Sequence, residues 1–471
     1  MTECKRERLD FQASEKRRVE AAFDGGHLSS DGGLLFVREL ENRVKILKRF
    51  AGCFYDHRDP GYVEHPVEDL VKQRVFALAC GYEDVNDHDH LNSDVLLALA
   101  CGKADPEGRS RIRARDRGKA LAGKSTMCRM ELGGTKKEPH KDKYKKIVLD
   151  FEKAEKLLLD IFEESLKDVP DELVLDLDAT DDPLHGNQEG AFFNGYYKAY
   201  CYLPLYIFCG DHLLLARLQT SDVDPAKAGM TAIRKTVREL RRRFPKTRLI
   251  LRGDGGFCRE ELMDLCESPM MDFVFGLPKN KRLEKLLESA MSESREKFQP
   301  DGEAVRTFSE FSYKPLETWE HPRRVIGKAE INDKGENPRF VVTTMKPEKW
   351  EPKELYEDFY CARGDMENRI KEQQLGLFGD RLSTSWIKSN QLRLFFSSFA
   401  HTLFRALRED GLKGTRMEKA QCWTMRTQLM KIAVRITLSV RRIKISFPTP
   451  YPYKEMFHQV LRQIRQVPIR C

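Results

Sequence analysis

Residues 172–181 read ELVLDLDATD, and their alternation indicates the class of fold. Every second residue from Leu173 to Leu177 is leucine, which is the spacing of a β-strand with one buried face. The opposite face carries Asp176 and Asp178, and a carboxylate in an apolar strand costs free energy unless charged partners compensate it. We therefore predict a strand that presents Asp178 to a functional site. An exposed strand face or a strand-end cap is the alternative.

The sequence after this strand predicts a meander followed by alternating helices and strands. Apolar runs at 200–209 and 213–219 flank Gly210-Asp211, which indicates a hairpin, so the first three strands should pair antiparallel. The elements expected next are a helix over 225–244, a buried strand in TRLILRGDGGF (247–257), a short helix over 259–266 and a strand in DFVFGLP (272–278).

The rest of the chain divides by composition and periodicity. Residues 1–100 look mostly helical, and VEDLVKQRVFALA (67–79) repeats its apolar residues at helical spacing. Residues 284–345 hold Pro, Gly, charge and strand-like pieces, which indicates an inserted, strand-rich subdomain. Helical periodicity returns from about Glu354. VRITLSVRRIKISF (434–447) alternates like a strand with a basic face, which suits an edge strand facing a polyanion or solvent.

Positive charge is concentrated in one part of the chain. Lys and Arg number 82 against 74 Asp and Glu, and this net charge of +8 does not by itself indicate nucleic-acid binding. Residues 103–146, however, hold 15 basic and 6 acidic residues. We expect this segment to contact DNA; a solvated loop and helix face is the alternative.

Composition also argues against several classes of protein. The N-terminal MTECKRERLDFQ has no apolar core, so no signal peptide is expected. The most apolar stretch, 191–210, contains Asn, Lys and Pro and indicates paired buried strands rather than a membrane span. The 12 cysteines form no CxxC pair, so we expect reduced core residues rather than zinc ligands. A soluble, cytoplasmic protein without a membrane partner is predicted.

Asp254 and Glu367 are further candidates for the site. Asp254 follows an apolar run and precedes two glycines, so it stands at the end of a buried strand, where metal ligands are often found; an ordinary Asp-Gly turn is the alternative. On a helix, Tyr360, Arg363, Glu367 and Lys371 step by 3, 4 and 4 and share one face. That face offers an acid to a metal and cations to phosphates, or it is a solvated lattice of ion pairs.

Three carboxylates from separate elements suit a site with two metal ions. Two divalent ions about 3.5–4 Å apart need several oxygen ligands. One ion activates the attacking water or 3′-hydroxyl, and the other stabilises the leaving oxygen during in-line displacement at phosphorus. Asp178, Asp254 and Glu367 together fit this chemistry better than any one of them does alone.

Two motifs resemble binding sites, one for a nucleotide phosphate and one for a metal ion, but neither is expected to act as one. GKALAGKS (118–125) satisfies the P-loop pattern, but the preceding GRSRIRARDR is unlike the buried strand that a P-loop follows. Lys124 and Arg129 are therefore expected to contact DNA. Asp-His-Asp-His at 87–90 cannot bring four adjacent side chains onto one ion, so helix caps and surface hydrogen bonds are expected there.

The sequence resembles the DDE transposases of bacterial insertion sequences, in the branch described as transposase DDE domain group 1. The motifs are DLDATD around Asp178, RGDGGF around Asp254, and Y-x2-R-x3-E from Tyr360 to Glu367, which is similar to part of the family's YREK signature. Further blocks that resemble that branch are SSDGGLLFVREL, DHRDP, QRVFALACGYEDVNDHDHL, LAGKSTMCRMELG, DDPLHGNQEGAFFNGYY and NQLRLFFSSFAHTL.

The resemblance implies an α/β fold, with an RNase H-like mixed sheet flanked by helices, a helical N-terminal region, and a β-rich insertion between the second Asp and the Glu. It implies that Asp178, Asp254 and Glu367 bind two Mg²⁺ ions, for which Mn²⁺ substitutes. The expected segments are a DNA-binding region at 1–165, a catalytic core at 166–283 and 346–445, the insertion at 284–345, and a basic tail at 446–471.

The resemblance also implies roles for the residues around the acids. Tyr360 and Arg363 are expected to contact phosphate near the cleaved strand. The family's signature lysine should fall seven residues after the glutamate, where this chain has Gln374, so Lys371 is the candidate to supply that charge. Trp319, in the insertion, is expected to stack on a displaced base or to lie in a small core.

The implied activity is metal-dependent cleavage and strand transfer at terminal inverted repeats. The implied partners are double-stranded DNA of the transposon ends and of the target, with a homodimer in the synaptic complex and a nucleoid-associated location. The alternatives are a catalytically decayed DNA-binding protein of a mobile element, a non-joining RNase H-like nuclease and, last, a P-loop ATPase.

Overall fold

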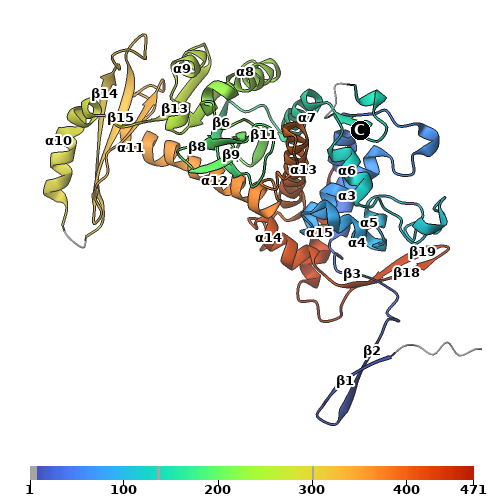
Figure 1. Cartoon of the computed structure of the whole chain (residues 1–471). Helices are drawn as coiled ribbons and strands as arrows, with labels where there is room; N and C mark the ends of the chain where they lie inside the picture. The colour runs from blue at the N-terminus through green and yellow to red at the C-terminus, as the bar shows by residue number, and fades with distance from the viewer. Residues whose placement is uncertain (1–7, 135–137, 300–301, 471) are drawn as a thin grey trace, which may run out of the picture. The chain divides into compact units, whose positions relative to one another are not determined.

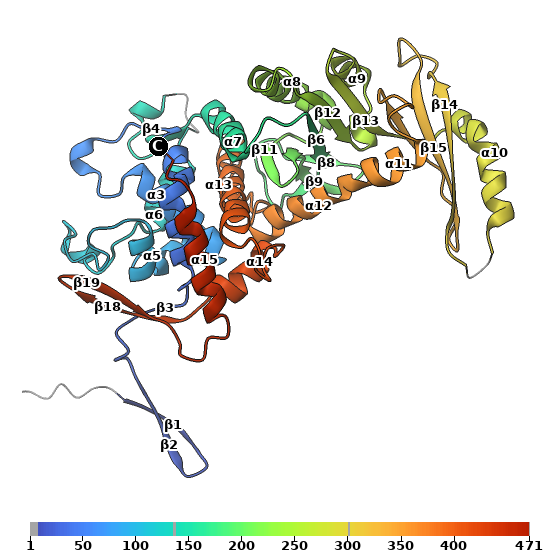
Figure 2. The same ribbon diagram turned by 180° about the vertical axis from the view of Figure 1, so that it is seen from behind.

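The computed structural model describes residues 8–134, 138–299 and 302–470, so positions 135–137 of the basic segment lie outside the described residues (Figures 1 and 2). The chain forms two compact units. Unit 1 combines Met1–Leu149 with Phe399–Cys471, and unit 2 is Asp150–Ser398. The two ends of the chain therefore belong to one unit, and the candidate acids belong to the other.

Unit 2 is built on a mixed sheet that has nine strands among the described residues. Its order is β11 (His212–Arg217), β10 (Leu205–Cys209), β6 (Glu172–Ala179), β12 (Arg248–Gly253), β13 (Met271–Leu277), β17 (Arg339–Thr343), β15 (Arg323–Asn332) and β14 (Val305–Tyr313), with β16 (Gly335–Glu336) on β15. β12 runs parallel to β6 and β13, and the other neighbours are antiparallel. The predicted antiparallel meander is confirmed, and its three strands are β6, β10 and β11.

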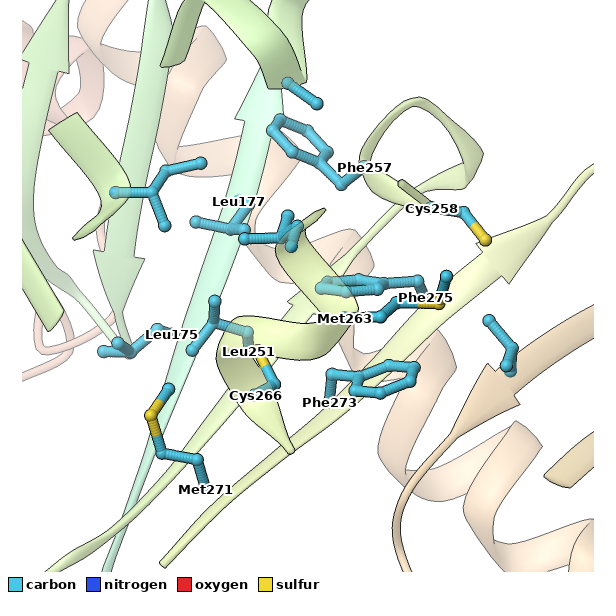
Figure 3. Close-up of a cluster of buried hydrophobic side chains, with 14 of the residues drawn as sticks. Leu175, Leu177, Leu251, Phe257, Cys258, Met263, Cys266, Met271, Phe273 and Phe275 are labelled. Atoms are coloured by element: carbon cyan, nitrogen blue, oxygen red, sulfur yellow. The ribbon is translucent and has the colours of Figure 1, made fainter. Parts of the chain in front are cut away.

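Alternation along the strands gives this sheet two different faces. Leu175 and Leu177 lie in a buried cluster with Leu251, Phe273 and Phe275 (Figure 3). Burying such a side chain stabilises the fold by about 1.5–3 kcal/mol. The helices that contribute to this cluster are α7 (Phe151–Ser165), α8 (Pro225–Arg243), α9 (Glu260–Cys266) and α10 (Lys281–Lys297). The predicted apolar face of residues 173–177 thus packs under these helices.

The opposite face is covered by one helical run with changing pitch. It comprises α11 (Pro352–Glu354), the π-helix η6 (Leu355–Tyr360), the 3₁₀ turn η7 (Cys361–Arg363), α12 (Gly364–Lys371) and the π-helix η8 (Glu372–Gly376). Leu355 packs near Ile250 and Val274 of the sheet, and Met366 packs near Tyr206 and Phe208. Helical structure was predicted here, but the π turns were not; such turns are frequent at functional sites.

The segment predicted to be strand-rich, 284–345, is only partly so. Its first part belongs to helix α10, because Leu283, Leu287 and Met291 repeat at helical spacing and are buried. The strands β14 to β17 that follow extend the core sheet, since β17 pairs with β13. These elements lie at one end of unit 2 (Figure 1). Trp319 is 6% exposed and packs on Tyr313, so it has a core position.

Unit 1 joins helices from both ends of the chain. They are α1 (Leu34–Val44), α2 (Ile46–Ala51), α3 (Val67–Cys80), α4 (His88–Leu91), α5 (Val95–Ala100), α6 (Lys124–Glu131), α14 (Cys422–Met425) and α15 (Lys454–Gln466). Strand β3 (His27–Ser29) pairs with β18 (Val434–Ser439), and β4 (Phe54–Asp56) pairs with β5 (Ile147–Leu149). The boundary between the two units, at Ser398 and Phe399, falls within the helix α13 (Ile387–Ala406).

The ends of unit 1 differ in part from the sequence prediction. Residues 8–22 are not helical; they form a hairpin of β1 (Arg8–Ser14) and β2 (Arg17–Ala22), in which Phe11 pairs with Val19. The basic stretch 434–447 forms two strands, β18 and β19 (Arg442–Ser446), because the chain turns at Val440-Arg441. The predicted exposed basic face is present and includes Arg435 and Lys444.

Two smaller predictions concern membranes and cysteines. Among the described residues no helix combines the length and the apolar character that crossing a membrane requires. None of the ten cysteines in the described part of the chain forms a disulfide.

Candidate active site

The three candidate acids line one pocket of about 290 Å³ in unit 2. Asp178 is the penultimate residue of β6, Asp254 directly follows β12, and Glu367 lies on α12. In the parallel pairing of β6 with β12, Arg252 lies opposite Asp176, so one further strand repeat brings Asp254 alongside Asp178. Ligands of open α/β sheets bind at the carboxyl ends of strands, which is where these two acids lie.

Glycines shape the turn that holds Asp254. Its Oδ1 accepts a hydrogen bond from the Gly256 N–H at 2.9 Å, which caps the 3₁₀ turn Gly255–Phe257. A Cβ added at Gly276 of β13 would lie 2.6 Å from the Tyr360 hydroxyl and 2.9 Å from the Gly255 nitrogen. Because residue 276 has no side chain, Tyr360 can approach the turn of Asp254 closely.

Arg363 bridges two of the acids. Its Nη1 lies 3.5 Å from Asp178 Oδ1, and its Nη2 lies 3.2 Å from Glu367 Oε1. Burial alone would lower the pKa of Arg363, but Tyr360 and the three acids raise it above its ordinary value. The guanidinium therefore stays charged and is a cation placed among the carboxylates.

The charge of Arg363 does not fully offset the effects of burial and of the neighbouring acids on Asp178. Burial is the largest cause that raises the pKa of Asp178 to about 7; Arg363 lowers it in part, and Asp254 and Glu367 raise it further. A carboxyl whose pKa is raised by burial and by neighbouring acids marks a place where added positive charge is stabilising.

The residues present fit a metal site by their chemistry. Carboxylate oxygens are the ligands that Mg²⁺ prefers, and the unbalanced negative charge at Asp178 favours a divalent cation. Among the described residues, however, no group of three or more His, Cys, Asp or Glu side chains is arranged so that it could hold a metal ion. Arg363 instead satisfies two of the acids through the contacts given above.

A buried ion pair lies directly behind the acids, and sequence reasoning missed half of it. Arg252 Nε lies 2.6 Å from Asp176 Oδ1 and Nη2 lies 2.9 Å from Oδ2. Arg252 also donates to the Phe359 carbonyl and lies over the Phe359 ring. The pair therefore ties β6 and β12 to the helical run that carries Tyr360 and Arg363. The one signal in the sequence was spacing, since each partner precedes an acid by two residues.

Lys371 and Gln374 also line the pocket. Lys371 is exposed, whereas Gln374 is 8% exposed and its Nε2 donates to Asp182 Oδ1 at 2.5 Å. Burial, and the charge of Asp380, raise the pKa of Asp182 well above its ordinary value. Gln374 is thus held by a buried acid. Lys371 is the lysine that lines this pocket. Two further lining residues, Thr180 and Tyr197, were not singled out from the sequence.

Lys124 and Arg129 lie elsewhere, on α6 of unit 1. Asp89 Oδ1 accepts the Lys124 N–H at 2.9 Å, so a carboxylate occupies the helix N-terminus, where a P-loop would bind phosphate. No strand precedes this helix within described residues 111–123. Asp87 likewise caps a turn, through the Asp84 N–H. The P-loop interpretation is therefore wrong, as the sequence predicts. Asp87 and Asp89 are caps, as expected, but His88 is fully buried against Gln73, so its hydrogen bond is not the expected surface one.

The fold and pocket define an α/β protein with acids gathered at the ends of parallel strands. The chain belongs to the family described as transposase DDE domain group 1, which it matches over residues 11–469. The resemblance seen in the sequence is thereby confirmed. Among solved structures, it is similar to the cryo-EM structure of the piggyBac transposase synaptic complex with hairpin DNA, with 12% identity, a TM-score of 0.37, and coverage of 85% of this chain and 80% of that chain. No curated protein matches it.

Proposed function

We propose that this chain is the transposase of a bacterial insertion sequence, which cuts DNA at terminal inverted repeats and transfers the ends to target DNA. The observation that carries the proposal is the convergence of Asp178, Asp254 and Glu367, from three separate elements, on one pocket. The sheet supports an RNase H-like core, because β12 and β13 add in parallel beside the first strand of the meander. The proposed core is 166–283 and 346–445, with a DNA-binding region at 1–165 and a basic tail at 446–471.

The acids are the proposed ligands of two Mg²⁺ ions, with Mn²⁺ as a substitute. When bound, the ions supply a Lewis acid for the leaving oxygen and an activated hydroxyl for attack. Asp178, Asp254 and Glu367 provide the oxygen donors, and Asp178 must lose its proton to serve as one. Arg363 exchanges its contacts with Asp178 and Glu367 for others in the loaded site.

The cationic wall of the pocket is the proposed phosphate-binding surface. Released from the acids, the Arg363 guanidinium can donate two parallel hydrogen bonds to phosphate oxygens, a geometry that arginine favours. Lys371 adds a point charge, and burial raises the pKa of Tyr360, which keeps its hydroxyl protonated as a donor. These groups orient the phosphate for in-line attack and stabilise the charge that builds on it.

The proposed partners are duplex DNA of the transposon ends and of the target. Both ends must be cut together, so a homodimer that holds two ends, associated with the nucleoid, is the proposed working form.

The decisive experiment uses a labelled duplex that carries the terminal repeat flanking the gene. Cleavage is compared in Mg²⁺ and in EDTA, for the native chain, for Asp254→Asn and for the matched control Asp222→Asn. Asp222 is an exposed acid of the same unit that does not line the pocket. DNA binding is measured in parallel, because phosphate contacts supply most of the affinity.

We expect the native chain and Asp222→Asn to cut in Mg²⁺, and Asp254→Asn to bind DNA without cutting. Binding without cleavage by every chain, in every metal, would identify a decayed DNA-binding protein instead. Cleavage without joining to target DNA would identify a nuclease. Full cleavage by Asp254→Asn would show that this acid is not a ligand.

A further inference from the structure

A second pocket, wholly within unit 1, has a strongly positive lining. Its volume is about 520 Å³, and its walls come from residues 58–65, 89–129 and 143–147. We call it the unit-1 basic pocket. Eight Lys and Arg side chains line it against three Asp and Glu. A pocket of this size accommodates a group as large as a drug molecule, and its lining selects an anion.

Most of these cations are not neutralised within the protein. Arg58 is paired with Asp56 at 2.7 Å, and Arg111 with Glu64 at 2.9 Å. The remaining six form no ion pair with any acid of the described residues; they are Arg113, Arg115, Lys119, Arg129, Lys143 and Lys146. Unpaired cations gathered in one concavity are costly to the free protein and are typical of a site for a polyanion.

The interior of the pocket holds His65, which does not change this positive charge. His65 lies 2.6 Å from Arg111 Nη1 and 3.4 Å from Lys103 Nζ. Burial, and then the charges of Lys103, Arg111 and Arg58, lower the pKa of His65 to about 3, so its ring is neutral. The positive potential therefore remains available to a ligand.

Two exposed tyrosines stand among the cations. Tyr62 is 87% exposed and Tyr144 is 53% exposed. Arg129 and Lys143 lie over the Tyr144 ring, at 5.0 and 5.2 Å from its centroid. Cationic grooves with exposed aromatic rings are how proteins bind single-stranded nucleic acid, because phosphates meet the charges and bases stack on the rings.

We propose that the unit-1 basic pocket binds single-stranded DNA. The phosphodiester backbone lies against Arg113, Arg115 and Lys119, and unpaired bases stack on Tyr62 and Tyr144. A concave pocket of this volume admits an unpaired nucleotide, whereas a duplex would lie across its mouth. The identity of the strand as DNA rests on the proposed function, but the pocket's binding requires no cleavage.

The test uses the full-length Asp254→Asn chain, so that catalysis plays no part, and measures binding of labelled oligothymidylate by fluorescence anisotropy. A duplex and an oligouridylate of the same length are the comparison ligands. One variant is Tyr62→Ala/Tyr144→Ala and a second is Arg113→Gln/Arg115→Gln/Lys119→Gln. The control, Lys285→Gln/Lys334→Gln/Lys346→Gln, removes three exposed charges from unit 2. Thermal unfolding checks that each variant is folded. Tyr62→Ala alone is included because Tyr62 is 87% exposed and its replacement should disturb the fold least.

The tyrosine pair is expected to weaken oligothymidylate binding by about 5- to 150-fold per base stack lost, with little change for the duplex. The arginine-lysine triple should also reduce the salt dependence of binding, by up to about 2 in the log–log slope. The proposal is overturned if the control triple weakens oligothymidylate binding as much as the arginine-lysine triple does. It is also overturned if the tyrosine pair weakens duplex and single-strand binding equally, or if oligouridylate binds more tightly than oligothymidylate. Binding of oligothymidylate without any cleavage activity would leave this inference standing while the proposed function failed.

Discussion

Arg252 on β12 donates two hydrogen bonds to Asp176 on β6, and each of these residues precedes a candidate catalytic acid by two positions. The same guanidinium donates to the carbonyl of Phe359, the residue before Tyr360. One side chain therefore fixes the two strands that carry acids and the helical run that carries the cations. A shift of this pair would move both halves of the pocket together.

Replacing Arg252 by Met should destabilise the protein by about 3–5 kcal/mol, because Asp176 would be left buried without its partner. The free energy of unfolding in urea measures the loss. The double variant Arg252→Met/Asp176→Leu removes both charges and should recover most of it. If the single and double variants unfold alike, the pair does not have the role given to it here.

Gly276→Ala should disturb the site through Tyr360, because the new Cβ would lie 2.6 Å from the tyrosine hydroxyl. Overpacking of this kind costs about 1–3 kcal/mol, and we expect cleavage to fall while DNA binding persists. Adding Tyr360→Phe removes the clashing hydroxyl and should restore part of the stability, though not the activity. Equal melting temperatures for the single and double variants would show that the clash lies elsewhere, for instance at the Gly255 nitrogen.

Without metal, the protein should become less stable as pH rises toward neutrality. The pKa of Asp178 is about 7 in the folded chain against an ordinary 3.8, so the folded state holds this proton more tightly than the unfolded state. Between about pH 4 and 7 unfolding releases the proton, and stability falls with pH and levels off above 7. Each unit of pKa difference corresponds to about 1.4 kcal/mol.

Melting temperatures in EDTA at about pH 5 and pH 8 measure this effect. Asp178→Asn should flatten the profile, and Mg²⁺ should stabilise the native chain more at the higher pH, because the ion needs the ionised carboxylate. A profile that is identical in the native and Asp178→Asn chains would assign the pH dependence to another group.

Lys371→Gln should weaken binding of the transposon end and lower the salt slope by about 0.9, the value for one phosphate contact with duplex DNA. Gln374→Lys is the informative companion, because the family's signature lysine is expected at that position. The new cation would meet the buried Asp182, so we expect no gain in affinity in the Lys371→Gln background. Full rescue by Gln374→Lys would instead show that the side chain at 374 reaches the DNA.

The parts predicted from sequence are those that local patterns specify. The leucines from 173 to 177 fixed one face of β6, and the glycines after Asp254 marked the end of β12. Both follow from burial of alternating side chains and from turn chemistry, which act over a few residues. The placement of Asp178 and Asp254 side by side then required only that their strands be parallel neighbours.

The parts that were missed depend on residues far apart in the chain. Arg252 looks like an exposed strand residue until β6 lies beside β12, and Gln374 shows its role only beside Asp182, 192 positions earlier. The hairpin at 8–22 and the helix at 281–297 were missed for another reason: short or charge-rich segments carry weak periodicity.

The pairing of β3 with β18 has a consequence for how the protein is made. Residues 27–29 must wait for residues 434–439, so unit 1 stays unfinished while the whole of unit 2 leaves the ribosome. At bacterial and eukaryotic rates of about 5–20 residues per second, that delay is roughly 20–80 s. A chain that stops before Val434 keeps all three acids but cannot close the sheet that joins its two ends. Unit 1 can therefore be completed only after β18 has been translated.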